Sequence, residues 1–326
     1  MRDVTREAVF RPRLPWLGGD LQTVRNLLLG ISPDLSPWPV ERLMLPLADG
    51  DRLWLALHRP EQPRGRPLAV LIHGLSGSED SIHVRATARH LLRRGYPVAR
   101  LNLRGAGPSV ATCRGVYHAA ATDDLAELLD VLPGGLTRDG VVAVGYSLGG
   151  NLLLRMLGEA GARTPLLAAT AVSAPIDVAA TSVRFHRRRN RLYMRWLLGE
   201  LKREAFAHGR VLTARERVVI EEVTTIYDLD DRFVAPRHGF SGVDDYYARA
   251  SSLPLLPRIA VPTLVIHALD DPWIAPEAYR AFDWSKARSL HPVITRRGGH
   301  VGFHGFGGPV PWHDDRIAAF FDSLGP

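Results

Sequence analysis

The stretch Val141-Val142-Ala143-Val144-Gly145-Tyr146-Ser147-Leu148-Gly149-Gly150-Asn151 determines how the rest of the chain is interpreted. A short apolar run leads into the pattern Gly-x-Ser-x-Gly, and helically spaced apolar residues follow from Leu152 onwards. A serine between a buried strand and an amphipathic helix is typical of a nucleophile elbow, a tight turn that exposes the hydroxyl. The flanking glycines allow the strand and the helix to approach each other closely. Ser147 is therefore the candidate nucleophile.

The composition is that of an ordinary globular protein. The chain has 326 residues, of which 46% are hydrophobic and 23% are charged, which fits one large α/β domain with an insertion or two small domains. No apolar run is long enough to cross a bilayer, and the first residues lack the apolar core of a secretory leader. We therefore expect a cytoplasmic location. Cys113 is the only cysteine, which excludes an intrachain disulfide.

The basic charge of the chain does not by itself indicate a nucleic-acid partner. The formal net charge is +7 and the pI is near 10.0, but nearly all basic residues are arginines spread along the chain. No helix-turn-helix, zinc-finger or aromatic RNA-binding motif accompanies them, so we expect no nucleic-acid partner. The carboxylate pairs Asp230/Asp231 and Asp244/Asp245 lack clustered histidines, which favours capping and ion pairs over a metal site. We expect no metal and no cofactor.

Strands and helices alternate along most of the chain. This alternation predicts a mostly parallel, doubly wound sheet with crossover helices. Before it, two short alternating segments around a turn predict an antiparallel hairpin. The predicted hairpin strands are 42–47 and 52–58, the later strands are 68–72, 98–103, 141–144, 166–172, 263–267 and 290–295, and the helices are 82–94, 123–132 and 314–324.

The pattern divides the chain into three parts. Residues 1–40 are rich in proline and tryptophan and are expected to form an irregular arm with one short helix near 21–29. Residues 41–176 and 263–326 form the predicted core. Residues 177–262 interrupt the alternation with helical patterns at 181–203 and 214–222. An insertion of this length within a wound sheet is expected to form a helical cap over the catalytic edge.

A serine nucleophile needs a base and an acid, which should follow later strands in the order serine, acid, histidine. The strand 263–267 is followed by Asp270 and Asp271, and the register of Asp-Pro-x-Ile favours Asp271, with Asp270 as the fallback. The strand 290–295 is followed by His300 between glycines, which let its ring reach the serine. Each candidate stands where this architecture requires it.

Two backbone N–H groups are expected to stabilise the oxyanion of the reaction. One is the N–H of Leu148, which directly follows the serine. The other should come from the loop after the strand 68–72, which begins His73-Gly74-Leu75, and Leu75 is the expected donor. His73 itself is more simply explained as a structural loop residue.

The first helical pattern of the insertion is strongly basic, with aromatic residues interleaved. Such a run is usually a solvated helix face. The alternative is an amphipathic cap helix that is attracted to anionic lipid head groups or acidic substrates, and the sequence leaves both interpretations open. The arginines concerned are Arg184, Arg187, Arg188, Arg189, Arg191 and Arg195.

Taken together, these motifs resemble the YheT-like branch of the α/β-hydrolase superfamily, which is related to the eukaryotic abhydrolase-domain esterases and lipases. The resemblance covers nearly the whole chain. Asp20-Leu21 departs from the family pattern, which has a histidine before Gln22-Thr23. The motifs that carry the resemblance are Gly19-Asp20-Leu21-Gln22-Thr23, His73-Gly74-Leu75-Ser76-Gly77-Ser78, Leu103-Arg104-Gly105, Tyr146-Ser147-Leu148-Gly149-Gly150-Asn151, Ala174-Pro175-Ile176-Asp177, Ala235-Pro236-Arg237-His238-Gly239-Phe240, Asp245-Tyr246-Tyr247, Ser251-Ser252, Asp270-Asp271-Pro272 and Gly298-Gly299-His300-Val301-Gly302-Phe303.

The resemblance implies a Ser147–Asp271–His300 triad that acts on carboxylic esters with acyl chains. We therefore predict a cofactor-free serine hydrolase with the α/β-hydrolase fold and a small-molecule ester as substrate. Two alternatives use the same fold: an acyltransferase that passes the acyl group to an alcohol, and a binding protein without catalysis. The sequence does not indicate the oligomeric state or the natural ester.

Overall fold

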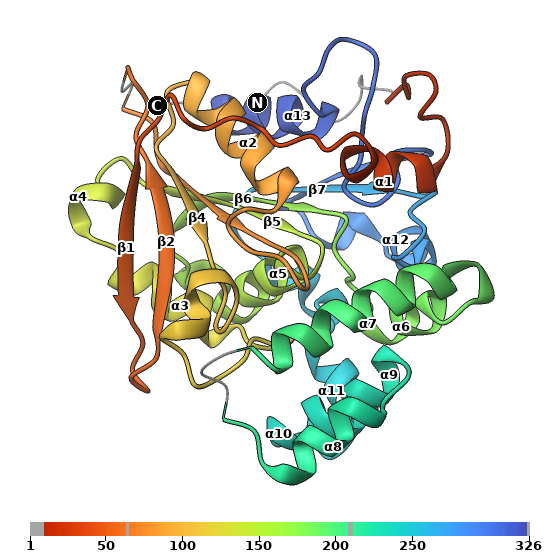
Figure 1. Cartoon of the computed structure of the whole chain (residues 1–326). Coiled ribbons are helices and arrows are strands. Elements are labelled where there is room, and N and C mark those ends of the chain that lie inside the picture. The colour runs from red at the N-terminus through yellow and green to blue at the C-terminus, as the bar shows by residue number, and fades with distance from the viewer. Residues whose placement is uncertain (1–9, 63–64, 208–210, 325–326) are drawn as a thin grey trace.

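A central eight-stranded sheet organises the computed structural model, which describes residues 10–62, 65–207 and 211–324 (Figure 1). The strand order is β1-β2-β4-β3-β5-β6-β7-β8. β2 pairs antiparallel with β1 and with β4, and the remaining neighbours pair parallel. The predicted fold class is confirmed. The strands are β1 (Val40–Pro46), β2 (Arg52–His58), β3 (Leu68–Ile72), β4 (Val98–Leu101), β5 (Val141–Tyr146), β6 (Leu166–Val172), β7 (Thr263–Ala268) and β8 (Leu290–Thr295).

Helices pack on both faces of the sheet because its central strands are apolar on both sides. All five residues of β3 and all six of β5 are buried. Helices α2 and α13 cover one face, and α3, α5 and α12 pack in the apolar core of the other (Figure 1). The helices are α1 (Gly19–Leu28), α2 (Ile82–Arg93), α3 (Asp123–Val131), α4 (Gly134–Thr137), α5 (Leu148–Ala160), α6 (Val178–Phe185), α7 (Arg191–Ala205), α8 (Ala214–Glu222), α9 (Ile226–Leu229), α10 (Ala235–Arg237), α11 (Val243–Ala250), α12 (Pro276–Ala281) and α13 (Trp312–Asp322).

Helices α6 to α11 lie between β6 and β7, in the interval where an insertion was expected (Figure 1). Asn151, one turn into α5, holds the end of this segment. Its buried side-chain amide donates to the Ala250 carbonyl at 2.8 Å and accepts from the Ser252 N–H at 3.1 Å. The helix that follows the elbow is therefore bonded directly to the inserted segment. The division of the chain into arm, core and cap stays a prediction.

The helical pattern over residues 181–203 corresponds to two helices in the structure. α6 ends at Phe185 and α7 begins at Arg191. The buried Asn190 side chain donates to the Arg184 carbonyl at 3.1 Å and to the Pro272 carbonyl at 2.8 Å. The amide thus bonds the Arg184 carbonyl at the end of α6, a group that would bond within the helix if the helix continued. Its bond to the Pro272 carbonyl attaches the turn to the loop after β7.

A buried carboxyl group joins α13 to α2 and to the sheet. Asp314 is fully buried and accepts a hydrogen bond from the Thr87 hydroxyl of α2, which is also hydrogen-bonded to the Tyr146 phenol. Burial raises the pKa of Asp314 to about 8. The carboxyl group therefore keeps its proton at neutral pH, because the apolar surroundings disfavour the charged form.

This proton makes stability depend on pH. An unfolded aspartate loses its proton near pH 4, whereas folded Asp314 holds it up to a pH of about 8, so the free energy of unfolding should fall as pH rises between these values. The asparagine of Asp314→Asn cannot ionise. The free energy of unfolding of this variant should therefore fall by roughly 1–3 kcal/mol less than that of the wild type between pH 5 and pH 8. Urea unfolding of both proteins at the two pH values measures this difference. Equal losses would contradict the prediction.

Candidate active site

Ser147 occupies the turn between β5 and α5 with φ 50° and ψ −120°. A positive φ is uncommon for a residue with a side chain, and here the surroundings impose it. A Cβ atom on Gly145 would lie 2.4 Å from the Gly149 carbonyl oxygen, and one on Gly149 would lie 2.3 Å from the His73 carbonyl oxygen. Side chains at these two positions would force the strand and helix apart. The sequence pattern therefore encodes the elbow through its glycines.

Asp271 and His300 form a buried hydrogen-bonded pair after β7 and β8. Asp271 Oδ2 lies 2.8 Å from His300 Nδ1. The other carboxylate oxygen accepts the backbone N–H groups of Trp273 at 2.8 Å and Ile274 at 3.0 Å. Burial alone would raise the pKa of Asp271, but the charge and hydrogen bond of His300 hold the pKa below its ordinary value. The carboxylate is thus ionised and oriented towards the imidazole.

Asp270, the fallback acid, points elsewhere. Its Oδ1 atom accepts the Gly299 N–H at 2.9 Å, and burial raises the pKa of its carboxyl group. Of the two neighbouring aspartates, Asp271 is the one bonded to the His300 ring.

Ser147 and His300 line the same cavity, which has a volume of about 720 Å³. Apolar side chains from the arm, the loop after β3, the elbow and helices α6, α7 and α11 form most of its wall. Ser147 is half-buried, so its hydroxyl group can be reached from this cavity. The structure thus brings the candidate nucleophile and the candidate base to one water-accessible space at the carboxyl ends of the strands.

The loop after β3 runs directly beside the nucleophile. A Cβ atom on Gly74 would lie 3.0 Å from the Ser147 Cβ atom, so only glycine permits this approach. Leu75 and Leu148 both line the cavity, and within the described residues neither backbone N–H donates a hydrogen bond. The adjacent N–H of Ser76 donates to the Tyr117 hydroxyl at 2.7 Å. Both expected oxyanion donors are thus free of other hydrogen bonds among the described residues, and their role stays a prediction.

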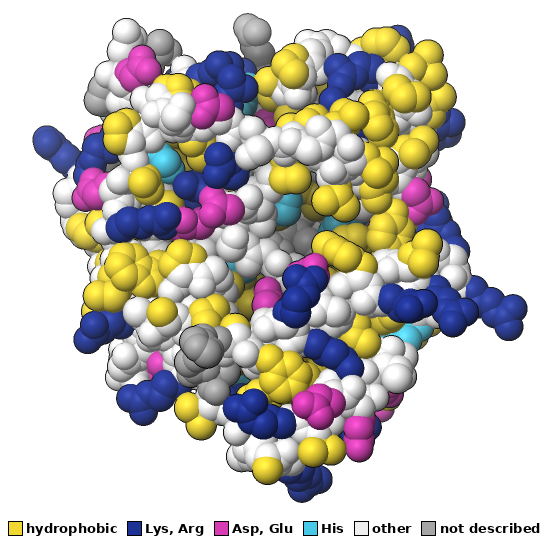
Figure 2. Space-filling model, in the orientation of Figure 1, with side chains coloured by type: hydrophobic (Ala, Val, Ile, Leu, Met, Phe, Trp, Pro, Cys, Tyr) yellow, Lys and Arg dark blue, Asp and Glu magenta, His cyan; other side chains and the backbone are white. Residues whose placement is uncertain are grey.

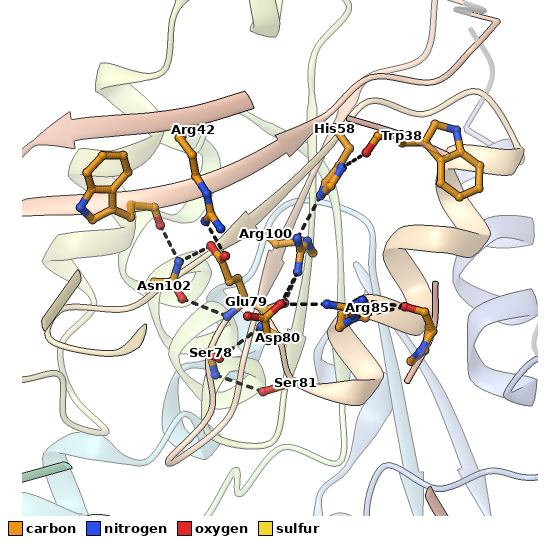
Figure 3. A network of polar contacts seen from close by, with 12 residues as sticks. Trp38, Arg42, His58, Ser78, Glu79, Asp80, Ser81, Arg85, Arg100 and Asn102 are labelled. Atoms are coloured by element: carbon orange, nitrogen blue, oxygen red, sulfur yellow. Dashed lines mark hydrogen bonds and ion pairs between the residues drawn. The ribbon is translucent and has the colours of Figure 1, made fainter. Parts of the chain in front are cut away.

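A buried polar network holds this loop in place (Figure 3). Glu79 is 1% exposed, forms an ion pair with Arg42 of β1, and accepts from the Asn102 side chain at 2.6 Å. The Asn102 side chain in turn accepts the Glu79 N–H at 3.0 Å, and Arg100 donates both to the Glu79 carbonyl and to His58. A buried carboxylate needs such partners. The loop is consequently fixed to three strands.

The arm contacts the loop that carries His300 directly, and this contact was not predicted from the sequence. The Thr23 hydroxyl accepts the His300 N–H at 2.8 Å and donates to the Gly19 carbonyl at 2.7 Å. The fully buried Gln22 side chain donates to the His304 carbonyl at 3.1 Å and accepts the His304 N–H at 2.6 Å. The Gln-Thr motif was part of the family resemblance, and it positions the His300 loop from 277 residues away.

Two further side chains, whose contacts with the acid and base the sequence did not predict, complete the surroundings of this pair. The Trp273 ring stacks on the His300 ring with centroids 4.5 Å apart. Arg184 of α6 donates to the Asp271 carbonyl at 2.6 Å. His73 accepts the Leu103 N–H at 3.1 Å, and burial lowers its pKa to about 4, as expected for a structural loop residue.

The structure also bears on metals and membranes. Among residues 10–62, 65–207 and 211–324, no group of three or more His, Cys, Asp or Glu side chains is arranged so that it could hold a metal ion. Within the same described residues, none of the helices combines the length and apolar character that a bilayer crossing requires.

Comparison with known proteins identifies relatives over nearly the whole chain. The family described as alpha/beta hydrolase fold matches residues 67–305. The “Putative esterase YheT” of Escherichia coli (strain K12) is 34% identical over 97% of this chain and 93% of its own length. The phospholipase ABHD3 of Homo sapiens is 28% identical over 73% of this chain and 59% of its own length.

Two other comparisons extend this picture. The medium-chain fatty acid ethyl ester synthase/esterase 2 of Saccharomyces cerevisiae is 29% identical over 73% of this chain and 58% of its own length. Among solved structures, the Pyrococcus furiosus esterase Pf2001 aligns with a TM-score of 0.61 at 16% identity, over 98% of this chain and 99% of that chain. Because the sequence identity is low, the match to the Pf2001 structure supports the fold alone.

The contact of the arm with His300 leads to a prediction. Thr23→Val keeps the shape of the side chain but removes the hydroxyl that accepts the His300 N–H. Ester hydrolysis should slow about tenfold in kcat, because the base loses a backbone anchor. KM should change by less than about twofold, because valine keeps the shape that Thr23 presents to the cavity wall. Thr23→Ser retains the hydroxyl and should keep most of the activity. An unchanged kcat in the valine variant would contradict this role.

Proposed function

Since the chain belongs to the YheT-like branch of the α/β-hydrolase superfamily, we propose that it cleaves carboxylic esters with a triad of Ser147, His300 and Asp271. As a member of this family, the protein is a carboxylic ester hydrolase of the esterase and lipase type. The observation that carries the triad is the 2.8 Å hydrogen bond between His300 and the buried Asp271, beside the cavity that Ser147 also lines.

In the proposed mechanism His300 takes the proton of the Ser147 hydroxyl as the serine oxygen attacks the ester carbonyl. Asp271 stabilises the imidazolium that forms, because its carboxylate accepts from Nδ1 and leaves the other ring nitrogen for the serine. His300 then gives the proton to the leaving alcohol, and the acyl group stays on Ser147. Water activated by the same histidine releases the acid.

The N–H groups of Leu75 and Leu148 are proposed to bind the oxyanion. Both residues line the cavity with Ser147, and neither N–H is engaged by another described residue. Donors that are already oriented stabilise the developing charge without reorganisation. The polar network around Glu79 supports this role, since it holds the loop that bears Leu75 (Figure 3).

Acyl-chain esters are the proposed substrate class. The cavity of about 720 Å³ is lined mainly by apolar side chains, which would bury an alkyl chain favourably. In this proposal residues 177–262 act as the cap that shapes the cavity, with α6, α7 and α11 contributing to its wall. The relatives named as a phospholipase and a fatty acid ethyl ester esterase are consistent with this class.

The triad is tested by Ser147→Ala. Loss of the nucleophile should reduce kcat by roughly a thousandfold or more, while the thermal midpoint stays close to that of the wild type. Hydrolysis of a series of esters with increasing chain length measures both the loss and the preferred acyl group. Ser289→Ala, on the protein surface, is the matched control. Wild-type turnover by the alanine variant would rule out the mechanism.

Acyl transfer is the second candidate, because one relative is named as both a synthase and an esterase of fatty acid ethyl esters. It uses the same acyl-enzyme but passes the acyl group to an alcohol. The same assay with ethanol added distinguishes the two activities. A hydrolase releases mainly the free acid, whereas an acyltransferase yields mainly the ethyl ester.

The mouth of the cavity is proposed to contact an anionic lipid surface. Three exposed apolar side chains at the mouth also line the cavity: Leu27 of α1 and Leu192 and Trp196 of α7, with 67%, 80% and 48% of their surfaces exposed. Asp20 of α1 joins the two helices through hydrogen bonds from Arg189 at 2.7 Å and Tyr193 at 3.2 Å. We call Leu27, Leu192 and Trp196 the mouth patch.

Basic side chains from the α6–α7 turn and from α7 accompany the mouth patch. Hydrophobic side chains gather over α1, and arginines project at the end of the α6–α7 segment (Figure 2). Within the described residues none of the following arginines has an acidic partner within ion-pair distance: Arg187, Arg188, Arg191 and Arg195. An apolar patch beside unpaired cations complements an anionic interface that presents acyl chains. This arrangement favours a lipid-binding helix over the alternative of a merely solvated helix face.

Vesicle binding tests the lipid contact. The wild type should bind phosphatidylglycerol vesicles more tightly than phosphatidylcholine vesicles, and high salt should weaken the binding. The double variant Leu192→Ser/Trp196→Ser should bind at least about tenfold more weakly, because it loses apolar burial. Val40→Ser/Met44→Ser removes exposed apolar side chains from β1 and is the matched control. Equal vesicle binding by all three proteins would contradict the proposal.

A further inference from the structure

A carboxyl group without a cationic partner lies in the wall of the active-site cavity. Asp230 begins the π-helical turn η4 (Asp230–Val234), is half-buried and lines the cavity. Its neighbours in the wall include Leu229, Phe233 and Val234, which are apolar. Among the described residues no arginine, lysine or histidine forms an ion pair with it. Such a group is costly to desolvate, so its presence in an apolar wall calls for a binding partner.

A chain of two hydroxyl groups from other elements leads to Asp230. Tyr247 of α11 donates to Asp230 Oδ2 at 2.7 Å, and the Ser182 hydroxyl of α6 lies 3.2 Å from the Tyr247 hydroxyl. All three side chains line the cavity. Three helical elements of the inserted segment thus contribute to one polar corner in an otherwise mainly apolar wall.

The adjacent Asp231 shows what a purely structural carboxylate does in this segment. Asp231 is exposed, does not line the cavity, and accepts the Val243 N–H at 3.2 Å at the start of α11. The Asp230 carboxyl group accepts no backbone N–H and pairs with no cation among the described residues. Its single hydrogen bond to Tyr247 leaves the other carboxyl oxygen available to a ligand in the cavity.

The chemistry of the corner matches a neutral hydroxyl group. Burial raises the pKa of Asp230 to about 7, so the carboxyl can carry a proton near neutral pH and then both donates and accepts hydrogen bonds. A hydroxyl group has the same dual character. Interruptions of a helix by π-helical turns are frequent at functional sites, which agrees with the placement of Asp230 at η4.

We propose that Asp230 and Tyr247 form a subsite that binds a free hydroxyl group of the ester substrate, so that polyol esters are preferred over plain alkyl esters. This proposal rests on the proposed esterase function, because it assigns specificity to the same cavity. A ligand without the hydroxyl group leaves the second carboxyl oxygen of Asp230 desolvated and without a hydrogen bond. A polar subsite rejects an apolar analogue in this way.

Ligand binding tests the subsite independently of hydrolysis. Calorimetry with the wild type should show that octyl glyceryl ether, which has two free hydroxyls, binds more tightly than octyl propyl ether, which has none. Asp230→Leu should weaken binding of the glyceryl ether about tenfold and leave the propyl ether unchanged or tighter. Asp230→Asn retains hydrogen-bonding groups and should keep most of the preference, and Asp231→Leu is the matched control.

Kinetics with a glyceryl, a propyl and a choline ester of one acid extends the test to turnover. Asp230→Leu should lower kcat/KM for the glyceryl ester about tenfold relative to the propyl ester. An unchanged ratio and unchanged ether binding, with both esters still cleaved, would overturn the subsite and leave the esterase function intact. A loss confined to the choline ester would also overturn it, since Asp230 would then bind a cation. Hydroxyl-dependent ether binding without hydrolysis of any ester would support the subsite and contradict the esterase function.

Discussion

The backbone of Ser147 is the constraint on which the rest of the site depends. Its φ of 50° is held by a strand and a helix that approach so closely that no side chain fits at Gly145 or Gly149. The same closeness brings the loop after β3 against the serine, because Gly74 also lacks a side chain. One strained residue is thus fixed from three sides by packing. This backbone position places Ser147 in the cavity wall.

The other parts of the site are held by bonds between distant segments rather than by local structure. His300 is bonded through its ring to Asp271 and through its backbone to Thr23 in the arm. The Glu79 network holds the loop that bears Leu75. Asn151 links the elbow helix to the inserted segment. Each anchor is a buried polar group whose hydrogen bonds are satisfied, which favours a single arrangement over many alternatives. The helices between β6 and β7 form part of the cavity wall, which is why we propose that they determine specificity.

The sheet and the elbow could be predicted from the sequence because both are encoded by short patterns. Apolar runs such as 68–72 reflect burial on both faces, and the glycines around Ser147 reflect contacts made within a few residues. The break between α6 and α7 could not be predicted in this way, because Asn190 bonds a carbonyl 82 residues later in the chain. For the same reason the roles suggested here for Thr23 and Asp230 required the structure, since their partners come from distant elements.

The most direct measurement of the central claim is the position and rate of labelling by a fluorophosphonate, followed by peptide mass spectrometry. The account predicts a single adduct on Ser147, because this serine stands at the elbow and lines the cavity together with His300, which is bonded to Asp271. It also predicts that His300→Asn slows labelling by about a hundredfold or more, because the hydroxyl then lacks its base. An adduct on another residue, or equally fast labelling without His300, would contradict the account.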